Sequence, residues 1–275
     1  MKKTLIWGLL FFICAGLSLS NIILTFNAGE NVAGVYGKSE SVIGWGLKRG
    51  TNGEIPQADA GAPELLSKYG AIYLGDTSQK TIYLTFDEGY ENGYTSQILD
   101  VLRENSVKGI FFITGDYLES SEALVRRMVE EGHEIGNHTY NHPSIPLCSK
   151  EKIEEELLSL DRSLQNKFSV NMRFLRPPKG EYNEYSLSVT REMSYINLFW
   201  SFAYEDWDEN KQRGTDYAYK KVIENLHNGA VLLLHAVSKD NANALDSIIK
   251  GAKEAGYTFG TPDQLAEYSK IVEQS

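Results

Sequence analysis

The sequence predicts an α/β fold, a distorted (β/α) barrel of about seven parallel strands, and two observations lead to this prediction. Short apolar runs recur from residue 80 onward, and the longer segments between them carry apolar residues at helical spacing. Several of these helical segments run into a glycine that stops a helix, at Gly132, Gly229 and Gly256. Strands that alternate with helices form parallel sheets, and this many units favour closure into a barrel over an open sheet.

The expected strands follow one another in chain order at 82–86, 109–114, 133–137, 173–176, 196–202, 230–235 and 257–260. Helical spacing between them is clearest from Lys150 to Asn166, where the apolar residues form one stripe and acids lie opposite. The stripe consists of Ile153, Leu157, Leu158, Leu160 and Leu164. We interpret it as core packing.

The N-terminus has the pattern of an export signal. Lys2 and Lys3 precede an apolar run from Thr4 to Phe26, as in a secretory signal or at the cytoplasmic flank of a membrane anchor. The run approaches the roughly 20 residues that span a bilayer, and no Ala-x-Ala cleavage site stands out. We therefore favour an uncleaved signal anchor, with membrane contact through residues 4–26, over a cleaved signal peptide. In both cases the protein is exported, anchored at or secreted from a bacterial cell surface.

The rest of the chain divides by composition. Residues 27–79 are rich in Gly, Ser and Asn, which predicts a spacer with an irregular N-terminal segment that wraps onto the main domain. We expect the main domain at residues 80–262 and a C-terminal helix at residues 263–275. Cys14 and Cys148 predict no disulfide, which suits a bacterial surface protein, and Cys148 is expected to be a half-buried loop thiol.

The composition excludes some classes of function. Apolar residues make up 42% of the 275 residues, enough for a sizeable core. A formal net charge of −10 opposes nucleic-acid binding, because phosphate contacts depend on lysine and arginine. A neutral or mildly cationic polymer remains compatible with this charge, and the oligomeric state is not indicated.

Polar residues that end the expected strands are the best candidates for a site, because chemistry in parallel α/β folds collects beyond the carboxyl ends of the strands. Asp87 and Glu88 end the first strand, in Thr85-Phe86-Asp87-Glu88-Gly89. Taken alone, this pair is an acidic corner in solvent. The other strand-end positions hold His138 with His142, Arg176 to Gly180, Glu205 to Trp207, and His235.

His138 and His142 lie four residues apart, so a helical turn would place both imidazoles on one face to bind one ion. A coincidental surface pair is an equal alternative for this spacing alone. Joined to one carboxylate, the pair predicts a zinc site with an open position for water, although such donors accept other divalent ions. One of the two acids would then ligate the ion and the other would take the proton from water.

His235 is the candidate second proton carrier, which would protonate the leaving group, because a histidine pKa lies near neutrality. It follows the apolar run Val231 to Leu234, so a buried core histidine is the alternative.

These residues resemble the motifs of the polysaccharide deacetylases, the NodB-homology or carbohydrate esterase family 4 group. The resemblance spans roughly residues 80–262 and keeps the order of the family's motifs. Its five motifs are TFDDG, H-S/T-x-x-H, R-P-P-x-G, Asp-Trp and L-x-H, matched at Thr85–Gly89, His138–His142, Arg176–Gly180, Asp206-Trp207 and Leu233–His235.

The resemblance implies a distorted (β/α) barrel and hydrolysis of the N-acetyl group of an amino sugar with one divalent metal ion, zinc before others. Peptidoglycan glycan strands are the implied partner. Asp87 takes the role of catalytic base, Arg176 orients it by a charge-assisted bond, and Asp206 tunes His235, the general acid.

The remaining implied roles concern the metal and the substrate. Glu88, His138 and His142 occupy the metal-ligand positions. Trp207 and Leu233 form the apolar wall around the acetyl methyl group, and Gly180 belongs to the substrate-binding set.

Two departures from the family pattern point to a subgroup. Glu88 stands where the family has a ligating aspartate, and Ala203 where an acid often precedes Asp-Trp. The segments 85–95 and 200–204 resemble the sporulation peptidoglycan N-acetylmuramic acid deacetylases. This implies deacetylation of muramic acid in peptide-stripped glycan, formation of muramic δ-lactam in spore cortex, and a location at the forespore or spore envelope.

Two alternatives stay open. The first keeps the reaction and changes the sugar to N-acetylglucosamine, in peptidoglycan or in chitin-like oligomers. The second is a glycan-binding pseudoenzyme whose metal site has decayed at Glu88.

Overall fold

The computed structural model describes residues 41–50 and 53–274. The predicted signal anchor, and the part of the spacer before residue 41, lie outside the described residues. Among the helices of the described part, none combines the length and the apolar character needed to cross a bilayer.

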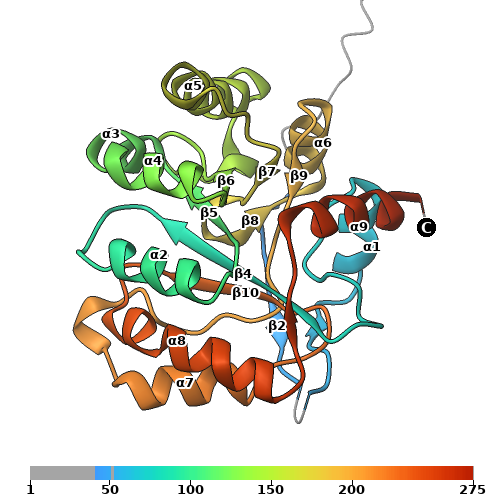
Figure 1. Ribbon diagram of the computed structural model, residues 1–275. Coiled ribbons are helices and arrows are strands. Elements are labelled where there is room, and N and C mark those ends of the chain that lie inside the picture. Colours follow the sequence, from blue (N-terminus) through green and yellow to red (C-terminus); the bar gives the residue numbers. More distant parts are fainter. Residues whose placement is uncertain (1–40, 51–52, 275) are drawn as a thin grey trace, which may run out of the picture. The chain divides into compact units, whose positions relative to one another are not determined.

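A parallel sheet of seven strands forms the centre of the fold (Figure 1). The strand order is β10-β4-β5-β6-β7-β9, and β11 pairs with the first residues of β4. This confirms the predicted α/β class with a curled parallel sheet. The strands are β4 Thr81–Glu88, β5 Gly109–Ile113, β6 Glu134–Asn137, β7 Phe174–Leu175, β9 Ile196–Asn197, β10 Val231–His235 and β11 Thr258–Phe259.

One predicted strand is much shorter than expected. Of the run 196–202, only Ile196–Asn197 forms a strand, and the continuous strand pairing ends there. Leu198 makes a single bridge to Ile72 and Phe202 one to Leu232. The sheet is therefore curled, and isolated bridges replace regular strands on the side between β9 and β10.

Helices surround the sheet (Figure 1). They are α2 Thr95–Glu104, α3 Gly115–Ser120, α4 Glu122–Glu130, α5 Lys150–Phe168, α6 Glu184–Glu192, α7 Thr215–Ile223, α8 Lys239–Glu254 and α9 Pro262–Gln274, with 3-10 turns at Ile145–Leu147, Pro178–Gly180 and Glu209–Lys211. The stripe of α5 is core packing, as predicted, except that Leu158 is 39% exposed. Cys148 is half-buried, also as predicted.

The described end of the spacer is more regular than an irregular wrap. It contains α1 Ala62–Lys68 and three short strands, β1 Ile43–Gly44, β2 Leu47–Lys48 and β3 Gln57–Ala58. β1 pairs with β8 Glu181–Tyr182, and β2 pairs with β3. The Trp45 indole N–H donates to the carbonyl of Trp200 at 2.9 Å, which ties this segment to the main domain.

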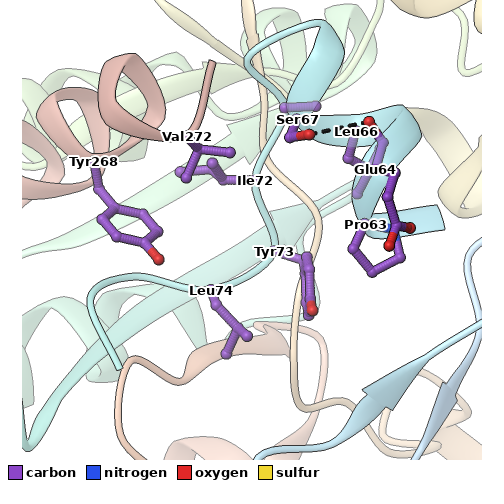
Figure 2. A pocket seen from close by; sticks show the side chains of 10 residues that line it. Pro63, Glu64, Leu66, Ser67, Ile72, Tyr73, Leu74, Tyr268 and Val272 are labelled. Carbon is purple, nitrogen blue, oxygen red and sulfur yellow. Dashed lines mark hydrogen bonds between the residues drawn. The ribbon is translucent and has the colours of Figure 1, made fainter. Parts of the chain in front are cut away.

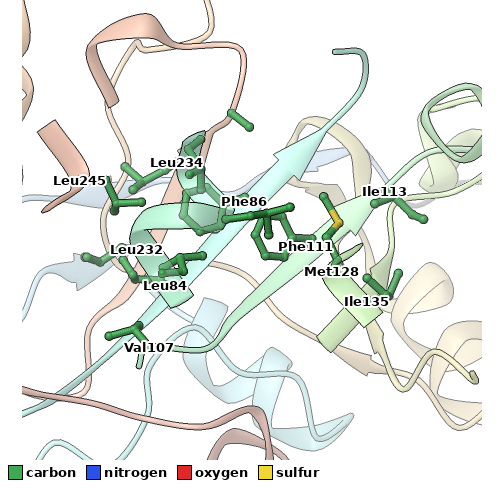
Figure 3. Close-up of a cluster of buried hydrophobic side chains, with 14 of the residues drawn as sticks. Leu84, Phe86, Val107, Phe111, Ile113, Met128, Ile135, Leu232, Leu234 and Leu245 are labelled. Atoms are coloured by element: carbon green, nitrogen blue, oxygen red, sulfur yellow. The ribbon is translucent and has the colours of Figure 1, made fainter. Parts of the chain in front are cut away.

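The core decides which way the side chains of β4 point. Leu84 and Phe86 belong to the cluster between the sheet and the surrounding helices, where Phe86 stacks on Phe111 (Figure 3). Tyr83 belongs to a second cluster with Ile110 and Phe112, inside the curl of the sheet. Since side chains alternate along a strand, odd-numbered residues of β4 face the interior and even-numbered residues face the helices.

Candidate active site

Asp87 and Arg176 form a buried ion pair at the end of β4. The Asp87 side chain faces the interior, and Arg176 Nη1 donates to Asp87 Oδ1 at 2.7 Å. Arg176 is fully buried, and its Nε donates to the carbonyl of Leu198 at 3.1 Å. Burial alone raises the pKa of Asp87, but the charges of Arg176, His138 and His235 outweigh it, so the pKa lies below its ordinary value. Asp87 is therefore an ionised, fixed proton acceptor.

His235 ends β10 beside Asp87, since the two residues are partners in the parallel register. Its Nδ1 lies 2.7 Å from Asp206 Oδ1, and Asp206 Oδ2 accepts the backbone N–H of His235 at 2.9 Å. Burial lowers the pKa of His235, but the charge and hydrogen bond of Asp206 reverse this, and the pKa lies above its ordinary value. With Nδ1–H directed to Asp206, the protonated form of His235 carries Nε2–H as the proton that it can donate.

His138 and His142 come together through a loop, not through the helical turn expected from their spacing. Thr139 and His142 have positive φ angles of 64° and 56°, and the ring centroids lie 4.8 Å apart. His138 Nδ1 bonds to the carbonyl of Arg176 at 2.8 Å. Burial lowers the pKa of His138 to about 4 and also lowers that of His142. Both rings are neutral at pH 7, with His138 Nε2 lying 3.6 Å from Asp87 Oδ2.

Glu88 does not join the two histidines. β4 continues through Glu88, whose Cα pairs with Ile113, so Asp87 and Glu88 point to opposite faces of the strand. Both Glu88 carboxylate oxygens are buried without a hydrogen-bond partner. Burial, and after it the charges of Glu91 and Asp87, raises the pKa of Glu88 well above its ordinary value. The structure thus contradicts the expected ligand set of Glu88, His138 and His142.

The pocket beside these residues has a volume of about 610 Å³ and is lined by Asp87, His138, His142 and His235, within the usual range for small-molecule sites. Trp207 is 52% exposed and its ring lies 5.6 Å from that of His235, while Leu233 is buried in the wall.

Gly180 lies in the same wall at φ 66°, and a Cβ there would stand 2.7 Å from the Trp200 ring. Only glycine fits position 180 of this turn.

Sequence reasoning missed residues that line this pocket, and one that bonds to Asp206. Arg49 comes from the turn-rich segment after β2, where the sequence carried no signal for a site. Lys179 is the variable residue inside the Arg176–Gly180 motif, so its position was a usable signal. Asn241 of α8 donates to Asp206 Oδ2, and only the folded structure brings it there.

A second pocket of about 290 Å³ lies between α1 and α9, on residues such as Leu66, Tyr73 and Tyr268 (Figure 2). It contains none of the candidate site residues, so it is separate from the active-site pocket.

Comparison with known proteins identifies the family of the chain. A family model described as polysaccharide deacetylase matches residues 74–198. The chain is 44% identical over 239 residues to the peptidoglycan-N-acetylmuramic acid deacetylase PdaA of Bacillus subtilis (strain 168), covering 85% of this chain and 91% of PdaA. The chain belongs to the polysaccharide deacetylase family.

Solved structures of family 4 carbohydrate esterases resemble most of this chain. The structure of Bacillus subtilis PdaA, a family 4 carbohydrate esterase, matches with a TM-score of 0.80 and 45% identity over 82% of this chain and 97% of that one. A family 4 carbohydrate esterase from Bacillus anthracis matches with a TM-score of 0.69 and 41% identity, over 83% and 97%.

Polysaccharide deacetylases are generally metal-dependent, and only part of the expected donor set fits a metal here. The hydrogen bond from His138 Nδ1 to a carbonyl leaves Nε2 free, which is typical of a metal ligand. Glu88, the expected third donor, points away, and among the described residues no group of three His, Cys, Asp or Glu side chains is placed to hold an ion. The three-ligand site does not fit, and zinc stays a prediction.

Proposed function

We propose that this protein hydrolyses the N-acetyl group of N-acetylmuramic acid in peptidoglycan strands that have lost their peptides. Its relationship to PdaA, a peptidoglycan-N-acetylmuramic acid deacetylase, supports the substrate. The observation that carries the reaction is the placement of an ionised acid, Asp87, beside a histidine whose pKa is raised, His235, at one pocket. One accepts a proton and the other donates one, as amide hydrolysis requires.

The reaction follows from these two proton carriers. Asp87 takes a proton from water as the water oxygen attacks the acetyl carbonyl carbon and a tetrahedral intermediate forms. His235 then donates its Nε2 proton to the sugar nitrogen, the C–N bond breaks, and a free amine and acetic acid leave, the acid losing its proton to solvent as acetate. Asp87 passes its proton to solvent and His235 takes one up, so the site returns to its starting state.

The other residues position these groups. Arg176 holds Asp87 in one orientation by the 2.7 Å ion pair, and Asp206 holds the His235 ring and favours its protonated form. Trp207 and Leu233 offer an apolar wall for the acetyl methyl group. No step is assigned to a metal ion, because the three-ligand set does not form.

The proposal extends to the product and the location. The freed amine of muramic acid lies in the same sugar as its lactyl carboxylate, so loss of water closes a δ-lactam, the form expected in spore cortex. We place the protein outside the cytoplasmic membrane, anchored through residues 4–26 or secreted, at the cell surface or the spore envelope.

The test is acetate release from peptide-free glycan, with mass spectrometry to show which sugar loses an acetyl group. The assay is run with chelator and with added zinc, so that metal dependence is read directly. Loss of the acetyl group from muramic acid supports the proposal, and loss only from N-acetylglucosamine contradicts it. Glycan binding without acetate release under either condition identifies a pseudoenzyme instead.

A further inference from the structure

Two basic side chains line the active-site pocket, and the proposed reaction uses neither of them. Arg49 comes from the segment after β2, and Lys179 from the 3-10 turn between β7 and β8. The protein as a whole is acidic, with a formal net charge of −10. Two cations at one pocket therefore oppose the charge of the rest of the molecule.

The acids of the pocket are neutralised by other partners. Asp87 is paired with Arg176 at 2.7 Å, and Glu205 with Lys211 at 3.0 Å. In the part of the chain that the structure describes, neither Arg49 nor Lys179 forms an ion pair with a carboxylate. The pocket thus offers two positive charges to a ligand.

Both side chains line the pocket, and Arg49 is fixed there by its contacts. Arg49 Nη2 donates to the carbonyl of Ala203 at 2.7 Å, and the guanidinium lies over the Phe202 ring at 5.9 Å. This contact leaves other Arg49 N–H groups free, because a guanidinium has five.

Lys179 has a φ of 59°, a left-handed conformation that costs a non-glycine residue energy and is concentrated at functional sites. Lys179 lines the pocket together with His138 and His142, the two imidazoles of the site.

We propose that Lys179 and Arg49 bind the free lactyl carboxylate of muramic acid and so select glycan strands without peptides. This inference rests on the proposed function and adds the basis of its specificity. Muramic acid carries a carboxylate on its lactyl ether, whereas N-acetylglucosamine has none at that position. In peptide-bearing strands the same carboxyl group is an amide, which is neutral and bulky. Charge-assisted bonds from Lys179 and Arg49 distinguish these three sugars.

The experiment compares two substrates that differ in this charge alone. One is peptide-free glycan, and the other is the same glycan after its lactyl carboxyl groups are coupled to methylamine. The readout is the ratio of kcat/KM for the acid to kcat/KM for the amide. For the wild type we expect a ratio of roughly ten or more, since a charge-assisted hydrogen bond changes binding by about a factor of ten. The ratio falls as salt is added, because both cations are exposed.

The variants are chosen to remove charge with little other change. Lys179→Met keeps an unbranched side chain, so the backbone strain at the positive φ is the same. We expect the ratio of kcat/KM for the acid to kcat/KM for the amide to drop towards one, mainly through a higher KM for the acid. Lys179→Arg keeps the charge and retains the preference. Arg49→Met lowers the ratio as well. Lys270→Met removes an exposed lysine of α9, outside the pocket, and leaves the ratio unchanged.

The outcomes separate the two proposals. The carboxylate site is overturned if the wild-type ratio is near one. It is also overturned if Lys179→Met and Arg49→Met both leave the ratio at the wild-type value. In both cases the proposed deacetylation of muramic acid stands. Absence of acetate release from either glycan by the wild type overturns the proposed function and this inference with it. Thermal unfolding midpoints equal to that of the wild type show that the variants are folded.

Discussion

The buried ion pair of Asp87 and Arg176 makes a quantitative prediction. Arg176→Met removes the 2.7 Å bond to Asp87 and the 3.1 Å bond to the Leu198 carbonyl, and leaves a carboxylate buried without its cation. Removing one partner of a buried pair costs about 3–5 kcal/mol of folding free energy. Asp87→Asn leaves the opposite charge unpaired and is also destabilising.

The double variant Asp87→Asn with Arg176→Met tests whether these costs arise from the pair. Because it leaves no unpaired charge, we expect it to be more stable than the sum of the single changes by about 2 kcal/mol, within the usual range for residues in contact. The measurement is urea unfolding of all four proteins at pH 7, read by circular dichroism. Additive free energies within error would refute the pairing as the source of the stability.

The pH dependence has a definite sign. In the wild type the pKa of Asp87 is lowered, so its contribution to stability is present above the unfolded pKa and is lost as pH falls through the folded value. In Arg176→Met, burial, which is the largest effect on this carboxyl, loses its main opponent, while His138 and His235 remain. The pKa of Asp87 therefore rises. The stability deficit of the variant is therefore greatest at neutral pH and narrows on acidification towards the unfolded pKa, near about 4. A deficit that widens on acidification contradicts this reasoning.

Three further predictions concern the site. Asp206→Asn removes the charge that raises the pKa of His235, so the alkaline limb of the pH profile of kcat/KM moves to lower pH; an unmoved limb excludes His235 as the acid. Gly180→Ala brings a Cβ to 2.7 Å from Trp200 at a φ of 66° and lowers the free energy of unfolding by about 1–3 kcal/mol; wild-type stability would show that the turn relaxes. Glu88→Gln removes a buried carboxyl whose raised pKa destabilises the fold above the unfolded pKa. We therefore expect its stability, relative to the wild type, to be higher at pH 7 than at pH 4, and we expect full activity because Glu88 points away from the pocket. Loss of activity or of metal binding would restore Glu88 as a ligand.

Apolar patterning predicted most of the sheet, because buried strands need continuous apolar runs whatever surrounds them. The seven expected strands all occur, and α5 begins at Lys150 as its stripe indicated. The run 196–202 forms a strand only at Ile196–Asn197, because the residues after it are buried but make isolated bridges in place of a continuous ladder; Phe199 and Phe202 pack as core side chains there. An apolar run in the sequence indicates that its side chains are buried, but it does not indicate whether the backbone forms the hydrogen bonds of a strand.

The site residues were found because strand ends meet at one edge of a parallel sheet, which brings Asp87 and His235 side by side. Glu88 was wrongly predicted as a metal ligand because the direction of its side chain depends on where β4 ends. The strand continues through Glu88, so its side chain points to the opposite face from that of Asp87. Arg49 was missed because its place depends on a tertiary contact with Ala203, more than 150 residues away. Such contacts leave no local pattern in the sequence.

The central claim is that Asp87 is the base of a muramic acid deacetylase. Acetate release from peptide-free glycan by the wild type and by Asp87→Asn tests it most directly, with mass spectrometry of the product and an unfolding curve for each protein. We expect the wild type to deacetylate muramic acid, and a folded Asp87→Asn to lose roughly 10²–10⁴-fold in kcat, the usual contribution of a general base. A folded Asp87→Asn with wild-type turnover would contradict it.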